Sequence, residues 1–214
     1  MRSRIISLFC IVAFAASLSA CKMDSAVPSG LEKIPPDVDQ VSVVDGDSLY
    51  DPQTLADVEG LAEYIVKGKL MGDAKQKLYT PDSKAVTFGI TVSSFQISHV
   101  FKGNLKEGDK ISIAERYYTA EENGKKIRYE LGYGPSVPNE EYIFFLIKDD
   151  DSNEFLRGYY TPSYKETGRY PVIDPDKKST FSAQTLMDSE LNLVLTDPDV
   201  YRGIYQEVID KYMK

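Results

Sequence analysis

The chain has 214 residues and a net charge of −8, with 33 acidic side chains against 25 basic ones. This surplus of negative charge repels nucleic acid, so we expect no nucleic-acid partner. Two cysteines and a single histidine are too few for a zinc site built from His and Cys ligands, and we expect neither a metal nor a cofactor.

The first 20 residues have the layout of a secretory signal. Two arginines, Arg2 and Arg4, precede an apolar stretch over residues 5–16, and small residues follow it. The apolar stretch is about a dozen residues long, whereas a transmembrane helix needs roughly 20, so we do not expect a membrane span there. We predict that the segment is removed by cleavage between Ala20 and Cys21.

The residues around this cleavage point resemble the signal of bacterial lipoproteins. The motif is Leu18-Ser19-Ala20-Cys21, and the resemblance implies that Cys21 is acylated and becomes the mature N-terminus. The implied partner is the membrane, bound through the lipid anchor at Cys21, on the extracytoplasmic side of the cell membrane or outer membrane. Ordinary secretion with an unmodified Cys21 is the alternative. Because Cys10 leaves with the signal, no disulfide is expected.

Residues 21–49 are predicted to form a flexible tether. They contain the breakers Pro28-Ser29-Gly30 and Pro35-Pro36-Asp37 and few aromatic side chains. In extended form, residues 22–40 could reach about 60 Å at about 3.1 Å per residue, which would hold a domain away from the membrane. A disordered leader without a spacing role is the alternative.

Residues 50–195 are predicted to form one mainly β domain. A short helix opens it, with Asp51 as its cap and Pro52 in its first turn. Alternating or continuous apolar residues then indicate strands near 64–70, 86–101, 111–113, 127–133, 142–147, 155–160 and 170–173. The continuous run at 142–147 is typical of a central strand, and Pro171 favours an edge position for the last one.

The longest alternation changes parity in the middle. Apolar residues occupy even positions from Val86 to Val92 and odd positions from Phe95 to Phe101. A β-bulge would shift the parity by one and bend the strand, so we predict a bulge at Ser93-Ser94.

Residues 196–214 are predicted to form an amphipathic helix that packs on the domain. Asp197 can cap this helix and Pro198 can start it. Four side chains then recur at i, i+4 spacing along one face: Val200, Ile204, Val208 and Tyr212.

The strand and turn pattern resembles a known family. The segments that carry the resemblance are 62–69, the long alternating strand, Phe101-Lys102-Gly103 with Gly108-Asp109-Lys110-Ile111, and 141–146. They resemble bacterial extracytoplasmic lipoproteins whose domain is an OB-like β-barrel, similar in topology to the netrin-like modules of metalloproteinase inhibitors. The resemblance implies a small OB-like barrel flanked by helices. The inhibitors' zinc-chelating N-terminal Cys does not carry over, because Cys21 has no Cys partner.

One histidine is the only candidate for a catalytic base of the Ser-His-Asp type. His99 lies near Ser94 and Ser98 in sequence, but no Gly-x-Ser-x-Gly motif is present to expose a nucleophile. A structural histidine on a strand or at a barrel rim is therefore the favoured interpretation, and we name no catalytic residue.

An acidic turn partly matches a calcium-binding loop. Asp149, Asp151 and Asn153 occupy the first three ligand positions of such a loop. The required Gly and Glu are replaced by Glu154 and Tyr160, which excludes an EF-hand. A solvated hairpin turn is favoured over a loose calcium site.

Tyrosine is unusually frequent, with 15 residues and no tryptophan. Tyrosine gives amphipathic contact area at a low entropy cost, and adjacent strand residues point to opposite faces. We therefore expect an exposed tyrosine-rich surface as the candidate binding surface, made from Tyr117, Tyr118, Tyr133, Tyr159, Tyr160 and Tyr164. The alternative is that these tyrosines are good strand formers that fill a barrel without tryptophan.

These observations predict a lipid-anchored cell-envelope protein that acts as a non-enzymatic binding or interaction module. An envelope protein or glycan is the expected partner. The prediction depends on the anchor, the barrel pattern and the lack of a recognisable catalytic set. The alternative is an envelope hydrolase that acts on wall glycan or peptide through carboxylates that the sequence does not single out.

Overall fold

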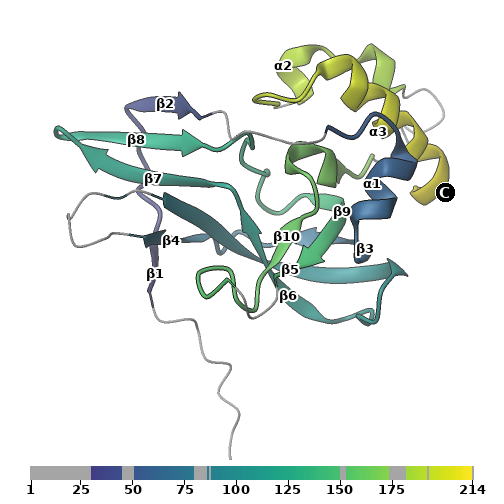
Figure 1. Ribbon diagram of the computed structural model, residues 1–214, viewed down its shortest axis with the longest axis horizontal. Helices are drawn as coiled ribbons and strands as arrows, with labels where there is room; N and C mark the ends of the chain where they lie inside the picture. Colours follow the sequence, from purple (N-terminus) through teal and green to yellow (C-terminus); the bar gives the residue numbers. More distant parts are fainter. Residues whose placement is uncertain are drawn as a thin grey trace, which may run out of the picture.

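A computed structural model describes residues 30–44, 51–79, 86, 88–149, 153–173, 182–191 and 193–213 (Figure 1). The predicted signal segment and Cys21 lie outside these residues. Among the described helices, none has the length and apolar character needed to cross a membrane. The described part is mainly β, as the sequence predicts, and a closed five-stranded barrel forms its centre.

The barrel strands are β3 (Tyr64–Leu70), β5 (Phe88–Lys102), β6 (Lys110–Glu115), β9 (Glu141–Lys148) and β10 (Tyr160–Pro162). Their order around the barrel is β3-β5-β6-β10-β9, and β9 pairs with β3 to close it. All neighbours are antiparallel except β6 and β10, which are parallel. Alternate residues such as Val66, Phe95, Ile113 and Phe144 fill the interior. This confirms the predicted OB-like fold class.

The predicted bulge at Ser93-Ser94 is wrong. The pairing of β5 with β6 runs through both residues without a register shift. The parity change arises because β5 crosses from one core to another: Ile90 belongs to a cluster outside the barrel, whereas Phe95 lies inside it. The register shifts of β5 occur later, in its pairing with β3, where Ser98 and Phe101 are skipped.

A second sheet contains β2 (Gln40–Val43), β8 (Lys125–Glu130) and β7 (Tyr117–Glu122), in that order. Further strands extend the barrel sheet: β1 (Leu31–Lys33) pairs with β4 (Lys75–Tyr79), which pairs with β5, and β11 (Arg169–Pro171) pairs with β9. The prediction of a flexible tether is therefore wrong for 30–44. The prolines there separate two short strands, whose partners lie far along the chain and leave no local signal.

Helices gather at one end of the barrel (Figure 1). They are α1 (Leu55–Leu61), α2 (Asp188–Leu191) and α3 (Pro198–Tyr212), with the 3-10 helices η1 (Lys165–Gly168) and η2 (Ala183–Thr185). The α3 prediction is confirmed: the Asp197 carboxylate accepts the backbone N–H groups of Asp199 and Val200, and Ile204 and Val208 are buried. Tyr201 and Tyr205 widen the buried stripe beyond the predicted i, i+4 row.

The cap predicted for the first helix is wrong by three residues. The N-cap of α1 is Thr54, whose hydroxyl accepts the backbone N–H of Asp57, 3.3 Å away. The Asp57 carboxylate accepts the backbone N–H of Thr54 in return, 3.0 Å away, which completes a capping box. Asp51 instead accepts a hydrogen bond from the Tyr164 hydroxyl, 2.9 Å away, and so ties the start of the domain to the end of the barrel.

Candidate functional site

The exposed tyrosine surface expected from the sequence is not present. Five of its six members are buried, with exposed fractions of 9% or less: Tyr117, Tyr118, Tyr133, Tyr159 and Tyr160. The adjacent rings of Tyr159 and Tyr160 do point to opposite sides of the chain, but other parts of the protein cover both sides. Tyr159 lies in the cluster outside the barrel and Tyr160 in the barrel interior. The five therefore fill the interior, as the alternative predicts, although only Tyr117, Tyr118 and Tyr160 lie in strands.

Tyr164 is the exception, because it is half-buried and lines two adjoining cavities. It lies in the turn between β10 and η1, and Lys165 follows it with a φ of +40°. One cavity, here the apolar cavity, has a volume of about 470 Å³. The other, here the polar cavity, has a volume of about 500 Å³. Tyr164 and Lys165 line both and form the wall between them.

The apolar cavity lies over the second and third barrel strands. Its lining residues are Val44, Phe88, Ile90, Ala114, Arg116, Leu131, Leu156, Thr161, Ser163, Tyr164 and Lys165. β5 supplies Phe88 and Ile90, and Ala114 comes from β6. Leu156 comes from the turn that connects β9 to β10. The floor is therefore made of strand side chains that point out of the barrel, and the polar groups lie around it.

Two cations at this cavity have no acidic partner in the part of the chain that the structure describes. Arg116 is exposed and Lys165 is half-buried. Among the described residues, no carboxylate oxygen lies within 4.0 Å of either side chain. The Oγ atom of Ser163, in the same lining, is shielded from solvent and has no hydrogen-bond partner. The cavity thus combines an apolar floor with positive charge that no described carboxylate compensates.

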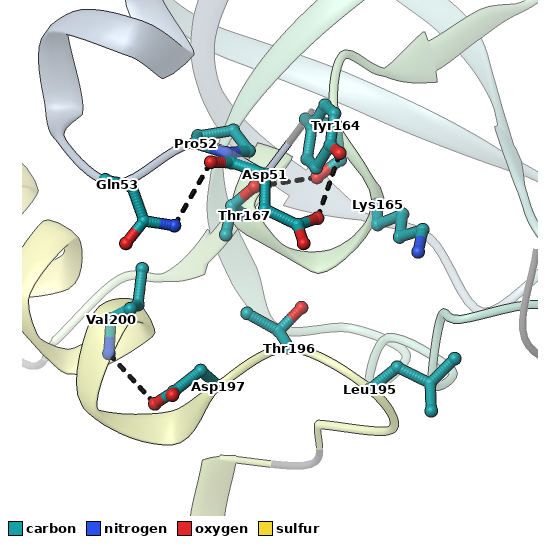
Figure 2. A pocket seen from close by; sticks show the side chains of 10 residues that line it. All are labelled: Asp51, Pro52, Gln53, Tyr164, Lys165, Thr167, Leu195, Thr196, Asp197 and Val200. Carbon is teal, nitrogen blue, oxygen red and sulfur yellow. Dashed lines mark hydrogen bonds between the residues drawn. The ribbon is translucent and has the colours of Figure 1, made fainter. Parts of the chain in front are cut away.

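The polar cavity lies between the segment before α1, the η1 turn and the start of α3 (Figure 2). Two carboxylates line it, but each is engaged: Asp51 accepts the Tyr164 hydroxyl, and Asp197 caps α3. In Figure 2 the Asp197 carboxylate turns toward the backbone of its own helix, and Lys165 extends away from Asp51. The cavity therefore does not present two carboxylates directed at each other across an open space.

A buried carboxylate fixes the wall between the cavities. Glu166 is fully buried, and its carboxylate accepts the backbone N–H groups of Gly134, Val194 and Thr196, at 3.2, 2.8 and 3.2 Å. These bonds tie the η1 turn to two loops that are distant in sequence. Thr167 adds a hydrogen bond of 2.8 Å from its hydroxyl to the Tyr164 carbonyl. Hydrogen bonds within the protein therefore fix the position of the η1 turn, which carries the wall between the two cavities.

A second buried charge cluster lies on the other face of β6. Glu115 points away from the apolar cavity, opposite to its neighbours Ala114 and Arg116. Arg169 Nη1 lies 3.8 Å from its Oε1 atom, and the Ser136 hydroxyl donates to the same oxygen. Burial raises the pKa of the Glu115 carboxyl. Because solvent does not reach the cluster, we assign it a structural role.

The other residues singled out from the sequence have structural contacts. His99 Nδ1 lies 2.7 Å from Glu107 Oε1 on an exposed part of β5, and the Ser98 hydroxyl donates to the Lys67 carbonyl instead of to the histidine. This agrees with the structural interpretation of His99.

At the acidic turn, Asn153 accepts the backbone N–H groups of Phe155 and Leu156, and Asp149 accepts the Thr161 hydroxyl. Asp151 lies outside the described residues. In the described part of the chain, no group of three or more His, Cys, Asp or Glu side chains is placed to hold a metal ion.

Sequence reasoning missed the residues that shape the apolar cavity, apart from Tyr164. Arg116, Leu131 and Lys165 come from three separate segments and belong to no motif. No protein-family model matches this chain, and no curated protein matches it either. The function therefore has to be argued from the cavities and the anchor motif alone.

Proposed function

We propose that this protein is a lipid-anchored component of the cell envelope whose OB-like barrel binds an envelope ligand without catalysing a reaction. The Leu18-Ser19-Ala20-Cys21 motif supports the anchor and the extracytoplasmic location. The observation that carries the binding role is the apolar cavity of about 470 Å³ on the outer face of β5 and β6. Cavities of this size suit small ligands.

The position of the cavity supports the same role. In OB folds, ligands bind over the second and third barrel strands and the loop between the fourth and fifth. Here those strands are β5 and β6, and the loop is the one that contains Leu156. A shared fold alone does not define a function, so the local chemistry of the cavity must also suit a ligand. It does so through an apolar floor and few polar groups, which is the usual composition of a ligand site.

The absence of tryptophan from the chain provides a sharp test. Leu156→Trp places a single fluorophore in the cavity lining, and Val137→Trp places one at an exposed position outside the lining. Both are made in the mature chain with Cys21→Ser, which needs no detergent. We expect an organic-solvent extract of cell envelopes to shift the emission of Leu156→Trp only. Equal shifts for both variants, or no shift for either, would overturn the proposal.

An envelope hydrolase is the second candidate, because the polar cavity holds Asp51 and Asp197. Glycoside hydrolysis needs one carboxyl group as acid and another as base or nucleophile. The capping role of Asp197 and the Tyr164 contact of Asp51 count against this function. The measurement is release of soluble fragments from purified wall material. The hydrolase would be favoured if Asp51→Asn abolished this release. The control is Asp37→Asn, at an exposed position outside the cavity, which should leave the release intact.

A further inference from the structure

We propose that the apolar cavity takes an amphiphilic anion, a molecule with an apolar body and a single anionic head. The apolar body would lie on the floor of the cavity, and Arg116 and Lys165 would bind the head. This inference rests on the proposed binding function and names the ligand class for the same cavity. Its basis is the positive charge of Arg116 and Lys165 in the cavity lining, whereas the proposed binding function is based on the size, position and apolar floor of the cavity.

The floor selects for an apolar body. Side chains from β5 and β6 meet residues from three loops there, and the apolar members are Val44, Phe88, Ile90, Ala114, Leu131 and Leu156. Ile90 and Ala114 are almost completely buried within the cluster outside the barrel, so the floor is continuous with a packed core. A ligand that covers this floor removes apolar surface from water, which favours binding in proportion to the area covered.

The two cations stand on the same side of the cavity, beside the turn at residues 131–132. The backbone N–H of Leu131 donates to the Arg116 carbonyl, 3.0 Å away. A Cβ atom at Gly132 would lie 3.3 Å from Lys165 Cδ, so the stem of Lys165 runs directly over that glycine. The Arg116 backbone and the Lys165 stem therefore both border this short turn, and we place the anionic head of the ligand beside it.

No carboxylate of the described residues compensates this positive charge. The three described arginines with a buried or half-buried side chain, Arg128, Arg169 and Arg202, each lie within 4.0 Å of a carboxylate, whereas Arg116 is exposed. Arg116 and Lys165 have no such partner among the described residues, although the mature chain carries 33 acidic and 23 basic side chains.

Other ligand classes fit these observations less well. A neutral glycan would leave both cations unused, and the buried tyrosines do not provide an exposed stacking platform. Nucleic acid would be repelled by a mature chain of net charge −10. A cationic amphiphile would place like charges together. An anionic head on an apolar body satisfies both the floor and the two side chains.

The test uses the mature chain with Cys21→Ser and isothermal titration calorimetry. The probes are dodecanoate, below its micelle concentration, and dodecanol, which has the same body and a neutral head. We expect dodecanoate to bind one per chain and at least about tenfold more tightly than dodecanol. Its affinity should fall as salt is added, because the head is held by charges near the surface.

The matched variants are Arg116→Gln with Lys165→Gln, and Lys106→Gln as a control at an exposed residue outside the cavity. The double variant should bind dodecanoate about tenfold more weakly and dodecanol unchanged, and the control should match the parent. Equal affinity for both probes, or an unchanged double variant, would overturn the role of the cations. If neither probe binds but an envelope extract still shifts Leu156→Trp, the ligand class is wrong and the binding function stands.

Discussion

The Glu115 carboxylate shows what a single buried charge costs this fold. The side chain is fully buried, and its Oε2 atom has no hydrogen-bond donor among the described residues. Arg169 Nη1 lies 3.8 Å from the Oε1 atom and donates to the Gly134 carbonyl and to the Ser136 hydroxyl. Taking a carboxylate out of water is expensive, and one distant cation repays only part of that cost. The raised pKa of Glu115 is the direct result of this burial.

The raised pKa predicts a pH-dependent stability difference between the parent and Glu115→Gln. Above pH 4.5 the unfolded carboxyl has lost its proton while the folded one still holds it, so raising the pH removes stability from the parent. Gln does not titrate. The advantage of the variant should grow from pH 4.5 toward the folded pKa, by about 1.4 kcal/mol per unit of pKa elevation.

The measurement is urea denaturation of both proteins at several pH values. Glu121→Gln, at an exposed position of β7, is the control and should follow the parent throughout. A difference in unfolding free energy between parent and Glu115→Gln that does not change with pH would contradict the prediction.

At the scale of elements, one side chain joins three strands. Gln76 on β4 is 2% exposed, and its amide nitrogen donates to the Glu32 carboxylate on β1, at 2.9 Å, and to the Thr119 carbonyl on β7, at 3.0 Å. Its amide oxygen accepts the backbone N–H of Thr119, also at 3.0 Å. The Gln76 amide therefore satisfies an edge of the second sheet and connects that sheet to the barrel sheet.

Gln76→Glu should destabilise the fold by about 2–3 kcal/mol. The change removes both donated hydrogen bonds and places a carboxylate against Glu32 and the Thr119 carbonyl, in a nearly dry site. The matched control is Gln53→Glu, which makes the same chemical change at an exposed residue. Thermal melting followed by circular dichroism compares the two. Equal melting temperatures would show that Gln76 does not hold the sheets together.

Elements with a strong local pattern could be predicted from the sequence, and elements defined by distant partners could not. Asp197 and Pro198 mark the start of α3, and the apolar run at 142–147 identifies a strand that β3, β10 and β11 surround. The short strand β2 has no such pattern, because its only support is the distant β8.

The candidate site was harder to predict than the fold, for a related physical reason. Burial of the tyrosines depends on which faces are covered, and local alternation does not contain that information. Tyr117 and Tyr118 lie at the start of β7, where the chain passes over β5: Thr91 donates to the Tyr117 carbonyl, and the Tyr118 ring lies against Gly89. The apolar cavity likewise combines Arg116, Leu131 and other residues from segments far apart in sequence.

At the scale of the whole molecule, the anchor is the prediction with the widest consequence. Cys21→Ser should move the protein from the membrane fraction to the soluble fraction, because two acyl chains hold a protein at a bilayer and a serine accepts none on sulfur. Cell fractionation with immunodetection and intact-mass analysis checks this. Ser19→Thr preserves Cys21 and serves as the control. Identical partitioning of parent and Cys21→Ser, with no acyl mass, would mean ordinary secretion.

The pairing of β1 with β4 changes how far the protein can stand from a bilayer. With residues 31–33 in the sheet, only ten peptide links separate Cys21 from the first strand. Fully stretched, they span about 35 Å. An anchored barrel would pivot about its β1–β4 edge within that height and sample the first few nanometres above the lipid. It would then meet molecules that enter or leave the membrane surface, and it would not reach across the periplasm or through a wall.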